Sequence, residues 1–372
     1  MRIVHGIHSL HPRHGGPPLV AASLAAAQAG LGHDVTLLSY DEGEDLADVA
    51  RQVPGLDAVD MRRLPRGGKL ERLTGRAFGA EVRLLRPEVG HFHRVWEADV
   101  AAGVAACRAV GATSLVAPHG MLDRWSMAQS TLKKKLALAV RVRRALESAD
   151  ALHVLNDAEA EGMSPLKLRA RTEVIANGIW PSVFDDLPDP SLFHEAFPAV
   201  GDRPYVLFMA RLHHKKGLDR LIDGMAELCD DGPSLVVAGP DDGARTEAET
   251  RAAEAGVTAH FTGPLLGDVK YAALAGAAAF GLVSRQEGFS VALLEAMAAR
   301  VPVVMSAACN FPEATDAGAG VIVEPDPTSV AAGIKAAVGS AMGDAGRRLV
   351  LRDYTWPAVA GRAVEAYERL RG

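Results

Sequence analysis

The sequence predicts an α/β protein of two doubly wound domains, each a parallel sheet with helices on both faces. Short apolar runs of strand length alternate with longer helix-forming segments through both halves of the chain. A length of 372 residues suits about two domains of ordinary size. The acidic, proline-broken segment 185–190 interrupts the alternation. We therefore expect one domain over 1–182 and another over 183–354.

The first half opens with a strand at 2–7, a helix at 19–29 and a strand at 35–39. Further strands are expected at 89–96, 113–117, 151–155 and 172–176, with helices at 99–110 and 126–149. Gly15 and Gly16 stand where the first loop enters its helix, so backbone N–H groups could approach a phosphate or sugar there. A tight turn explains this glycine pair equally well.

His119 follows the strand 113–117 directly and stands beside Gly120. In an open parallel sheet, ligands are bound at the carboxyl ends of the strands. His119 is therefore a candidate ligand contact, although a single histidine at such a place can also be purely structural.

The second half repeats the pattern, with strands at 205–209, 234–238, 260–265, 279–283, 301–305 and 320–323. Helices are expected at 218–228, 291–300, 328–342 and 355–370. Arg211 and Lys216 flank the loop between the first strand and helix of this half. A guanidinium fork and an ammonium point charge in one loop are suited to holding a pyrophosphate.

The segment 280–310 carries two carboxylates, Glu287 and Glu295, on either side of a glycine-marked turn. It has the pattern strand, loop, helix, strand, and Pro302 ends the helix. Glu287 then lies at the carboxyl end of a strand. Glu295, about two turns further on, can reach the same place from the helix. The ordinary alternative is a capping acid followed by a solvated helix residue.

The net charge of −6 conceals an asymmetry between the halves. Residues 1–182 hold 23 Lys and Arg against 20 Asp and Glu, whereas residues 183–372 hold 17 against 26. An acidic half does not suit general nucleic-acid binding. The basic stretches 62–86 and 133–144 could contact an anionic membrane surface, or could simply be solvated faces.

The chain has three cysteines without close pairing and no uncharged apolar run of about eighteen residues. These features predict a cytoplasmic protein without a membrane span, peripheral at the inner face of the plasma membrane if the basic stretches bind lipid.

Several motifs, in order and spacing, resemble the retaining glycosyltransferases of family 4, which have the two-domain GT-B fold. The resemblance covers nearly the whole chain. It rests on Gly15-Gly16, Gly32-His33-Asp34-Val35, Pro118-His119-Gly120, Asn177-Gly178-Ile179, Arg211 with Lys215-Lys216-Gly217, and Glu287-Gly288-Phe289-Ser290 through Glu295.

The resemblance implies a role for each matching position. Glu287, with the backbone of Gly288, Phe289 and Ser290, would meet the donor sugar and its phosphate, and Glu295 would bind the ribose. Arg211 and Lys216 would neutralise the diphosphate whose charge grows as the sugar bond breaks.

Other positions are implied on both domains. His119 would contact the donor sugar from the first domain, the loop of Gly15 and Gly16 would approach the sugar or phosphate, and Asn177 counts among the substrate-binding residues. Nucleobase contacts are expected at Gly239 and within 261–265, including Gly263 and Leu265. The helix from Thr355 would cross back to the first domain, and the active site would lie in the cleft between the domains.

The implied activity is metal-independent transfer of a hexose from a nucleotide-diphosphate sugar, with retention of configuration by front-side attack. No cofactor beyond the donor is implied, and the chain has no Asp-x-Asp sequence, the metal clamp of the other main transferase fold. The segment from His119 to Trp125 with its lysine-rich continuation looks like members that assemble bacterial capsule, exopolysaccharide or O-antigen. The acceptor would then be a glycan or a polyprenyl-diphosphate-linked sugar.

Two alternative functions are compatible with the same fold. A nucleotide-sugar epimerase would interconvert free nucleotide sugars without an acceptor. A non-catalytic sugar-nucleotide-binding scaffold would bind the donor without turnover even with the right acceptor present.

Overall fold

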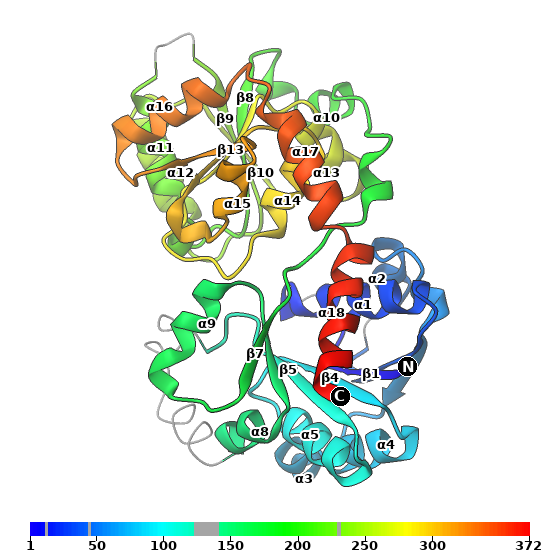
Figure 1. Ribbon diagram of the computed structural model, residues 1–372. Helices are drawn as coiled ribbons and strands as arrows, with labels where there is room; N and C mark the ends of the chain where they lie inside the picture. Colours follow the sequence, from blue (N-terminus) through cyan, green and yellow to red (C-terminus); the bar gives the residue numbers. More distant parts are fainter. Residues whose placement is uncertain (12–13, 44–45, 123–140, 229–231) are drawn as a thin grey trace. The chain divides into compact units, whose positions relative to one another are not determined.

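The computed structural model describes residues 1–11, 14–43, 46–122, 141–228 and 232–372. The chain forms two compact units: unit 1 is Met1–Asn177 with Trp356–Gly372, and unit 2 is Gly178–Thr355. Each unit has one parallel sheet with helices on both faces (Figure 1), which confirms the predicted α/β, doubly wound fold class. The division falls slightly before the expected 182/183, and the segment 185–190 belongs to unit 2.

Unit 1 contains a seven-stranded sheet in the order β3-β2-β1-β4-β5-β6-β7. Its strands are β1 (Arg2–Gly6), β2 (Asp34–Tyr40), β3 (Asp60–Leu64), β4 (Val89–His93), β5 (Thr113–Ala117), β6 (Ala151–Val154) and β7 (Arg171–Val174). All six neighbouring pairs are parallel. The sequence did not predict β3, because this partly exposed edge strand reads Asp-Met-Arg-Arg-Leu and lacks an apolar run.

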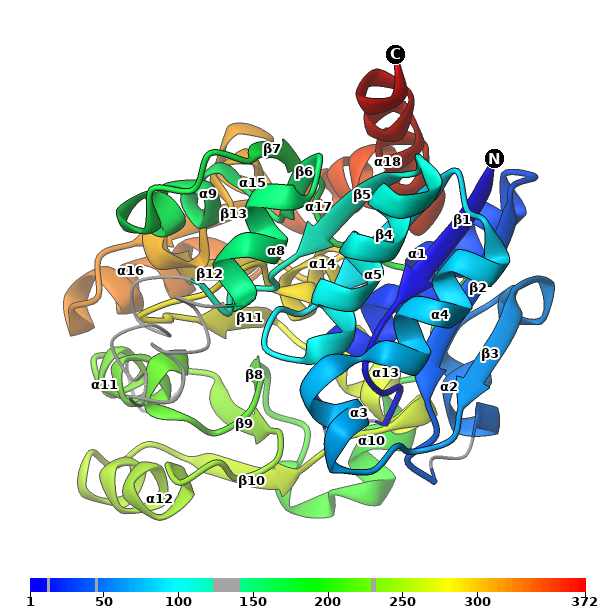
Figure 2. The same cartoon turned by 90° about the horizontal axis from the view of Figure 1, so that it is seen from below.

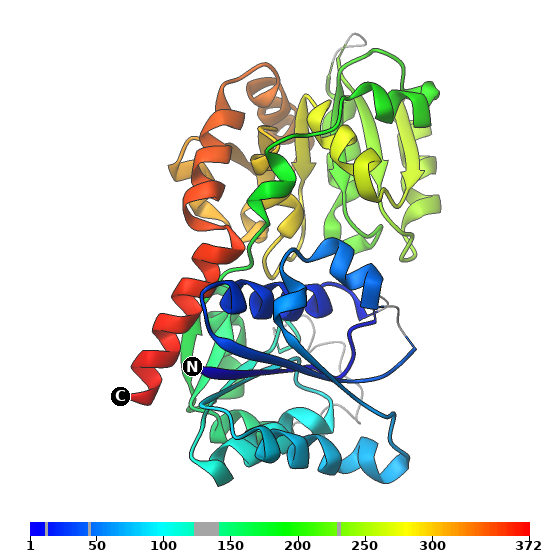
Figure 3. The ribbon, with the colours of Figure 1, turned by 90° about the vertical axis from the view of Figure 1, so that its right-hand side faces the viewer.

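Helices cover both faces of this sheet. They are α1 (Pro17–Gly30), α2 (Leu46–Gln52), η2 (Leu56–Ala58), α3 (Lys69–Thr74), α4 (Arg76–Leu85), α5 (Ala98–Val110), α8 (Arg143–Ser148), α9 (Asp157–Met163), η4 (Ser164–Leu166) and α18 (Trp356–Arg371). Helices α4 and α5 pack together over β1 and β4 (Figure 2), and α1 lies on the opposite face (Figure 3). Helix α18 packs on α1. Most of the helix expected at 126–149 lies outside the described residues.

Unit 2 contains a six-stranded parallel sheet in the order β10-β9-β8-β11-β12-β13. Its strands are β8 (Tyr205–Met209), β9 (Ser234–Ala238), β10 (Ala259–Gly263), β11 (Ala279–Leu282), β12 (Val303–Ser306) and β13 (Gly320–Val323). Its helices are η5 (Pro181–Phe184), α10 (Ser191–Ala196), η6 (Pro198–Val200), η7 (His214–Lys216), α11 (Leu218–Ala226), α12 (Arg245–Glu254), α13 (Gly267–Ala275), α14 (Val291–Ala298), η8 (Ala307–Cys309), α15 (Pro312–Asp316), α16 (Pro327–Ala337) and α17 (Met342–Asp353).

Helix α17 was not predicted as a separate element, and its glycines explain why. Glycine lowers helix propensity, but here it lets the helix approach its neighbours closely. A Cβ on Gly343 would stand 1.8 Å from the carbonyl oxygen of Arg300, and one on Gly346 would stand 2.9 Å from the Met297 side chain. The packing of α17 on α14 therefore depends on two residues that argue against a helix locally.

Each sheet has a point where the strand order reverses. In unit 1 this point lies between β1 and β4, and in unit 2 between β8 and β11. Loops that leave the carboxyl ends of such strands diverge and form the usual binding crevice of an open α/β sheet. Within the described part of the chain, no helix combines the length and apolar character needed to cross a membrane.

Candidate functional site

Two loops of unit 2 meet beyond the carboxyl ends of β8 and β11. The loop after β8 carries Lys216, whose Nζ donates a hydrogen bond to the Glu287 carboxylate in the loop after β11. Glu287 is only 8% exposed. Ser284 Oγ also lies 3.2 Å from Glu287 Oε1. A buried carboxylate and an ammonium group are therefore paired at the reversal point of this sheet.

The backbone of Glu287 is held as firmly as its side chain. Its N–H donates to the carbonyl of Ala308 over 3.0 Å, and its own carbonyl accepts from Asn310 Nδ2 over 2.8 Å. Ser306 Oγ donates to the carbonyl of Ser284 over 2.6 Å. These contacts fasten the loop after β11 to the end of β12 and to the residues that follow it.

Glu295 has a different partner from Glu287. Its Oε1 accepts a hydrogen bond from Lys270 Nζ over 2.7 Å. Burial opposes the charge on Lys270, but the Glu295 carboxylate outweighs it and the pKa of Lys270 is raised. Helix α14 thus presents its acid to a cation on α13, a residue that the sequence interpretation missed.

Arg211 and Lys216 leave the same loop but pair with different acids. Arg211 Nη1 donates to Asp242 Oδ2 over 2.7 Å in an exposed pair, whereas Lys216 binds the buried Glu287. The structure does not bring the Arg211 and Lys216 side chains to one carboxylate. Arg211 is the more available of the two cations, because an exposed ion pair is weakly held.

Gly217 explains why this loop can lie so close to β11. Its φ is +67°, and a Cβ here would stand 1.9 Å from the carbonyl oxygen of Val283. An additional clamp lies nearby: Arg285 binds Asp219 through two hydrogen bonds of 2.7 and 2.6 Å. The backbone N–H of Arg285 also donates to the carbonyl of Lys215 over 2.7 Å.

The other residues predicted in unit 2 take several positions. Gly288 and Ser290 are half-buried, and Ser290 is the N-cap of α14. The Phe289 ring packs against Phe311 and Tyr354, at centroid distances of 5.4 and 5.8 Å. The Phe289 side chain is therefore committed to packing, which leaves its backbone for a ligand.

The residues expected near a nucleobase lie at or just beyond the carboxyl ends of β9 and β10. Gly239 has a φ of +145°, and a Cβ there would stand 1.8 Å from the Ala210 carbonyl oxygen. The backbone packing alone therefore requires glycine at this position. Gly263 has a φ of +75° with open space around it. Leu265 is buried.

In unit 1, Gly15 and Gly16 are exposed at the start of α1. Gly15 has a φ of +80°, and nothing lies within 4 Å of a Cβ built on Gly16. Asn177, the last residue of this part of unit 1, is buried and its Oδ1 has no hydrogen-bond partner among the described residues.

His119 follows β5 in a strained backbone conformation with a φ of +53°. The next N–H, of Gly120, donates to Glu159 Oε1 over 2.5 Å, and the N–H of Leu155 donates to Glu159 Oε2 over 2.7 Å. Burial lowers the pKa of His119 to about 3, with His153 and Arg94 adding to the effect. His119 is therefore neutral at physiological pH.

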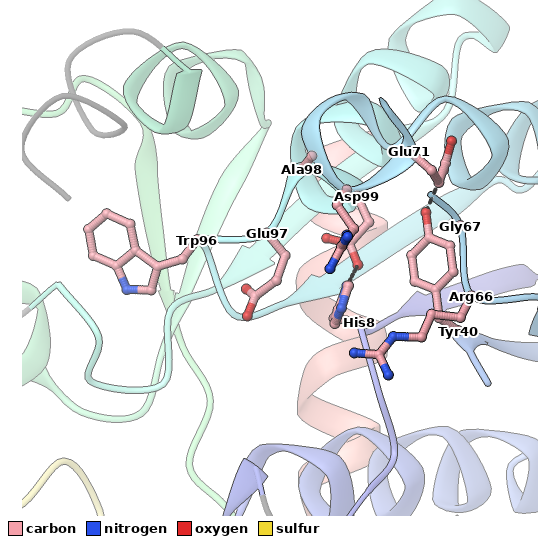
Figure 4. A pocket seen from close by; sticks show the side chains of 10 residues that line it. His8, Tyr40, Arg66, Gly67, Glu71, Trp96, Glu97, Ala98 and Asp99 are labelled. Carbon is pink, nitrogen blue, oxygen red and sulfur yellow. Dashed lines mark hydrogen bonds and ion pairs between the residues drawn. The ribbon is translucent and has the colours of Figure 1, made fainter. Parts of the chain in front are cut away.

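Unit 1 also contains a cavity of about 250 Å³ around its own reversal point. It is lined by His8, Tyr40, Arg66, Gly67, Glu71, Arg72, Trp96, Glu97, Ala98 and Asp99. Figure 4 shows His8 and Asp99 pointing toward one another, with His8 Nδ1 at 3.0 Å from Asp99 Oδ2. The hydrogen bond to Asp99 raises the pKa of His8 despite partial burial.

The sequence interpretation missed this pocket because its residues come from four separate loops or strand ends. Tyr40 ends β2, and its hydroxyl donates to Glu71 Oε1 over 2.6 Å. Arg66 pairs with Glu42 and belongs to the basic stretch interpreted as a surface feature. Only the positions of Tyr40 at the end of β2, and of His8 and Trp96 beyond β1 and β4, could have signalled the pocket.

The chain matches two family models, one in each half. "Glycosyl transferase 4-like domain" matches residues 15–178, and "Glycosyl transferases group 1" matches residues 191–344. A GDP-mannose-dependent alpha-(1-6)-phosphatidylinositol monomannoside mannosyltransferase of Mycolicibacterium smegmatis is 31% identical over 281 residues, covering 69% of this chain and 71% of that protein.

Solved structures with the same fold cover essentially the whole chain. Sucrose-phosphate synthase from Thermosynechococcus elongatus has a TM-score of 0.76 at 20% identity, covering 100% of this chain and 99% of that one. HepE of Anabaena, solved with UDP and glucose, has a TM-score of 0.77 at 17% identity, covering 99% and 100%. The chain belongs to the GT-B glycosyltransferases of family 4 and is a glycosyltransferase enzyme.

Proposed function

We propose that this enzyme transfers a hexose from a nucleoside-diphosphate sugar, with retention and without a metal, to a glycan or polyprenyl-diphosphate-linked acceptor in bacterial surface polysaccharide synthesis. The observation that carries the proposal is the meeting of Lys216 and Glu287 at the reversal point of the unit 2 sheet. A crevice there is where an open α/β sheet binds nucleotides.

The cations near this crevice suit a departing diphosphate. Lys216 and Arg211 each rest against a carboxylate that a phosphate group can replace. Positive charge on these side chains would stabilise the diphosphate as the sugar bond breaks, which is the task that a metal ion performs in other transferases. Glu295, held by Lys270, would accept hydrogen bonds from the ribose hydroxyls.

The acceptor is proposed to bind in the unit 1 pocket. The carboxylates of Glu97 and Asp99 line this pocket and can accept hydrogen bonds from the hydroxyl groups of a sugar. The exposed guanidinium groups of Arg66 and Arg72 suit an anionic group such as a carrier diphosphate. The ion pairs already formed by Arg62 and Arg63 reduce the charge left for a membrane surface.

Donor binding is the first test. The mycobacterial relative is named for GDP-mannose and HepE was solved with UDP and glucose, so GDP- and UDP-hexoses head the panel. Calorimetric titration should give binding for one base series that Glu295→Ala weakens and the control Glu254→Ala, an exposed acid on α12, leaves unchanged. No binding of any nucleotide sugar, with or without a divalent cation, would refute the proposed donor class.

The transfer reaction comes next, with the chosen donor and short glycans or polyprenyl-diphosphate sugars as acceptors. NMR of the product should show the donor's anomeric configuration, and a chelator should leave the rate unchanged. An inverted product or loss of activity on chelation would contradict the retaining or the metal-independent part. Interconversion of donor sugars without an acceptor would favour the epimerase alternative.

A further inference from the structure

Five histidines of unit 1 form one continuous hydrogen-bonded chain with a glutamine and a tyrosine. Four of these histidines lie on strands: His5 on β1, His91 and His93 on β4, and His153 on β6. All four are at most 2% exposed. Gln28 comes from α1 and Tyr367 from α18, the two helices that pack together in this unit.

The contacts run in a single line from His119 to a backbone carbonyl. In order they are His119 Nε2 to His93 Nδ1 (3.0 Å), His93 Nε2 to His5 Nδ1 (3.0 Å), His5 Nε2 to Gln28 Oε1 (2.7 Å), Gln28 Nε2 to the Tyr367 hydroxyl (3.0 Å), that hydroxyl to His91 Nδ1 (2.7 Å), His91 Nε2 to His153 Nδ1 (3.0 Å), and His153 Nε2 to the Ile175 carbonyl (2.6 Å).

The far end of the chain fixes the direction of every bond. A carbonyl oxygen only accepts, so His153 must carry its proton on Nε2 and accept on Nδ1. His91 must then donate from Nε2, and its Nδ1 must accept from the Tyr367 hydroxyl.

The same logic continues to the other end. The Tyr367 oxygen accepts from the Gln28 amide nitrogen, which turns the Gln28 carbonyl toward His5. His5 therefore donates from Nε2 and accepts at Nδ1, His93 donates from Nε2 to His5, and His119 donates from Nε2 to His93. The reverse direction would set a lone pair of His153 against the lone pairs of the Ile175 carbonyl at 2.6 Å.

We infer that this hydrogen-bonded series of histidines holds His119 as the neutral Nε2–H tautomer, so that His119 presents Nδ1 as a hydrogen-bond acceptor. Tyr367 and Gln28 act as positioning residues. Among the described residues, no hydrogen bond occupies Nδ1 of His119. The consequence for catalysis rests on the proposed function: Nδ1 would accept a hydrogen bond from a hydroxyl group of the donor sugar and could not donate one.

His5, His91, His93 and His153 must be neutral, because each accepts a hydrogen bond and a doubly protonated imidazole has no acceptor nitrogen. His119 only donates within the series, and it is neutral because burial lowers its pKa to about 3. Burial lowers the pKa of His5 and of His153 to about 4. It also lowers the pKa values of His91 and His93 well below the ordinary value, with neighbouring histidines contributing.

A metal site is the competing interpretation of these histidines. One nitrogen atom of each of His5, His91 and His93 lies within 4.8 Å of the others. However, both ring nitrogens of all three already take part in the chain, so a metal would have to break it. If the wild-type protein bound zinc through these histidines and did not show the tautomers derived above, the inference would be overturned.

The test is NMR of protein labelled with ¹⁵N in histidine, which distinguishes protonated from unprotonated ring nitrogens without any substrate. Wild-type His119 should be protonated at Nε2 and unprotonated at Nδ1. The opposite pattern would overturn the inference, whatever the fate of the proposed function. This measurement on the wild type needs no variant and therefore no assumption about folding.

Tyr367→Phe tests the positioning role. Removing the hydroxyl frees the Gln28 amide to turn, so His119 should become a mixture of both tautomers. The value of kcat/KM should fall in proportion to the fraction that keeps the wild-type tautomer, about twofold for an even mixture. The matched control is Tyr205→Phe, which removes another buried hydroxyl, bonded to the Ala273 carbonyl over 2.6 Å, in unit 2. The control should lose comparable stability with no change in the His119 tautomer. An unchanged tautomer in Tyr367→Phe would refute the positioning role.

Discussion

The two reversal points of this enzyme are built from different chemistry. In unit 1, neutral histidines are joined by directional hydrogen bonds under buried conditions, and their positions are fixed by strands. In unit 2, ion pairs lie in the loops and on the helices that follow them: Lys216 with Glu287 in the loops after β8 and β11, and Lys270 on α13 with Glu295 on α14. A hydrogen-bonded series of neutral histidines can present one ring nitrogen in a defined tautomer. Ion pairs can instead exchange an internal carboxylate for an anionic ligand.

The largest expected effect comes from removing charge at the unit 2 site. Lys216→Met should lower kcat by about 10²–10³, as loss of one preorganised charge-stabilising donor does elsewhere. It also leaves the buried Glu287 without its cation. Steady-state kinetics would measure the loss. The control Lys335→Met changes an exposed lysine of α16 and should leave kcat unchanged. Activity within tenfold of wild type would show that the unit 2 charges do not support the reaction as proposed.

The next effect concerns the close approach on which that loop depends. Gly217→Ala places a side chain at a φ of +67° and 1.9 Å from a carbonyl oxygen. The conformation alone costs about 1–2 kcal/mol, and the clash adds to this cost. Gly256→Ala has a φ of +70° with open space and so isolates the conformational cost. Urea unfolding should show a larger loss for Gly217→Ala, and equal losses would contradict the structural role of the contact.

Acidification should lower the folding stability of unit 1 more than that of unit 2. The folded pKa values of His5 and His153, at about 4, lie below the ordinary value of 6.5, so the unfolded chain binds more protons between these limits. The neutral buried histidines therefore contribute their full share of the unfolding free energy above about pH 6.5, and this contribution falls as the pH drops toward 4. His8, whose pKa is raised, opposes this trend by a single group.

Amide hydrogen exchange, corrected for intrinsic rates, would measure this difference. Protection in β1 and β4 should fall between pH 7 and pH 5 while protection in β8 and β9 is retained. Equal loss in both sheets over this window would indicate that the histidine chain does not dominate the acid response of unit 1.

The smallest effect tests the loop clamp of unit 2. Arg285→Lys keeps the charge but loses the two-point contact with Asp219, which should cost about 1 kcal/mol of unfolding free energy. Arg245→Lys, in the exposed helical pair with Glu249, should cost no more than about 0.5 kcal/mol. Chemical denaturation would compare them. A larger loss in Arg245→Lys would refute the clamp.

The buried strands were predictable because their signal is local. β5, β8 and β9 are apolar runs of strand length bounded by polar or breaker residues, and the structure has them at the predicted limits. β3 and α17 were missed because an exposed edge strand need not be apolar, and a helix packed through glycines has low intrinsic propensity.

The sequence by itself determined the α/β alternation, the family and the positions of Glu287 and Lys216 beyond strand ends. These properties follow from residue type and short spacing. Only the tertiary structure decided which groups meet: Glu287 with Lys216, Glu295 with Lys270, and Gln28 with Tyr367. The last pair is separated by most of the chain, and the direction of its hydrogen bond depends on a carbonyl at Ile175. Hydrogen bonds need atoms within about 3 Å, and residue patterns do not specify such distances between remote segments.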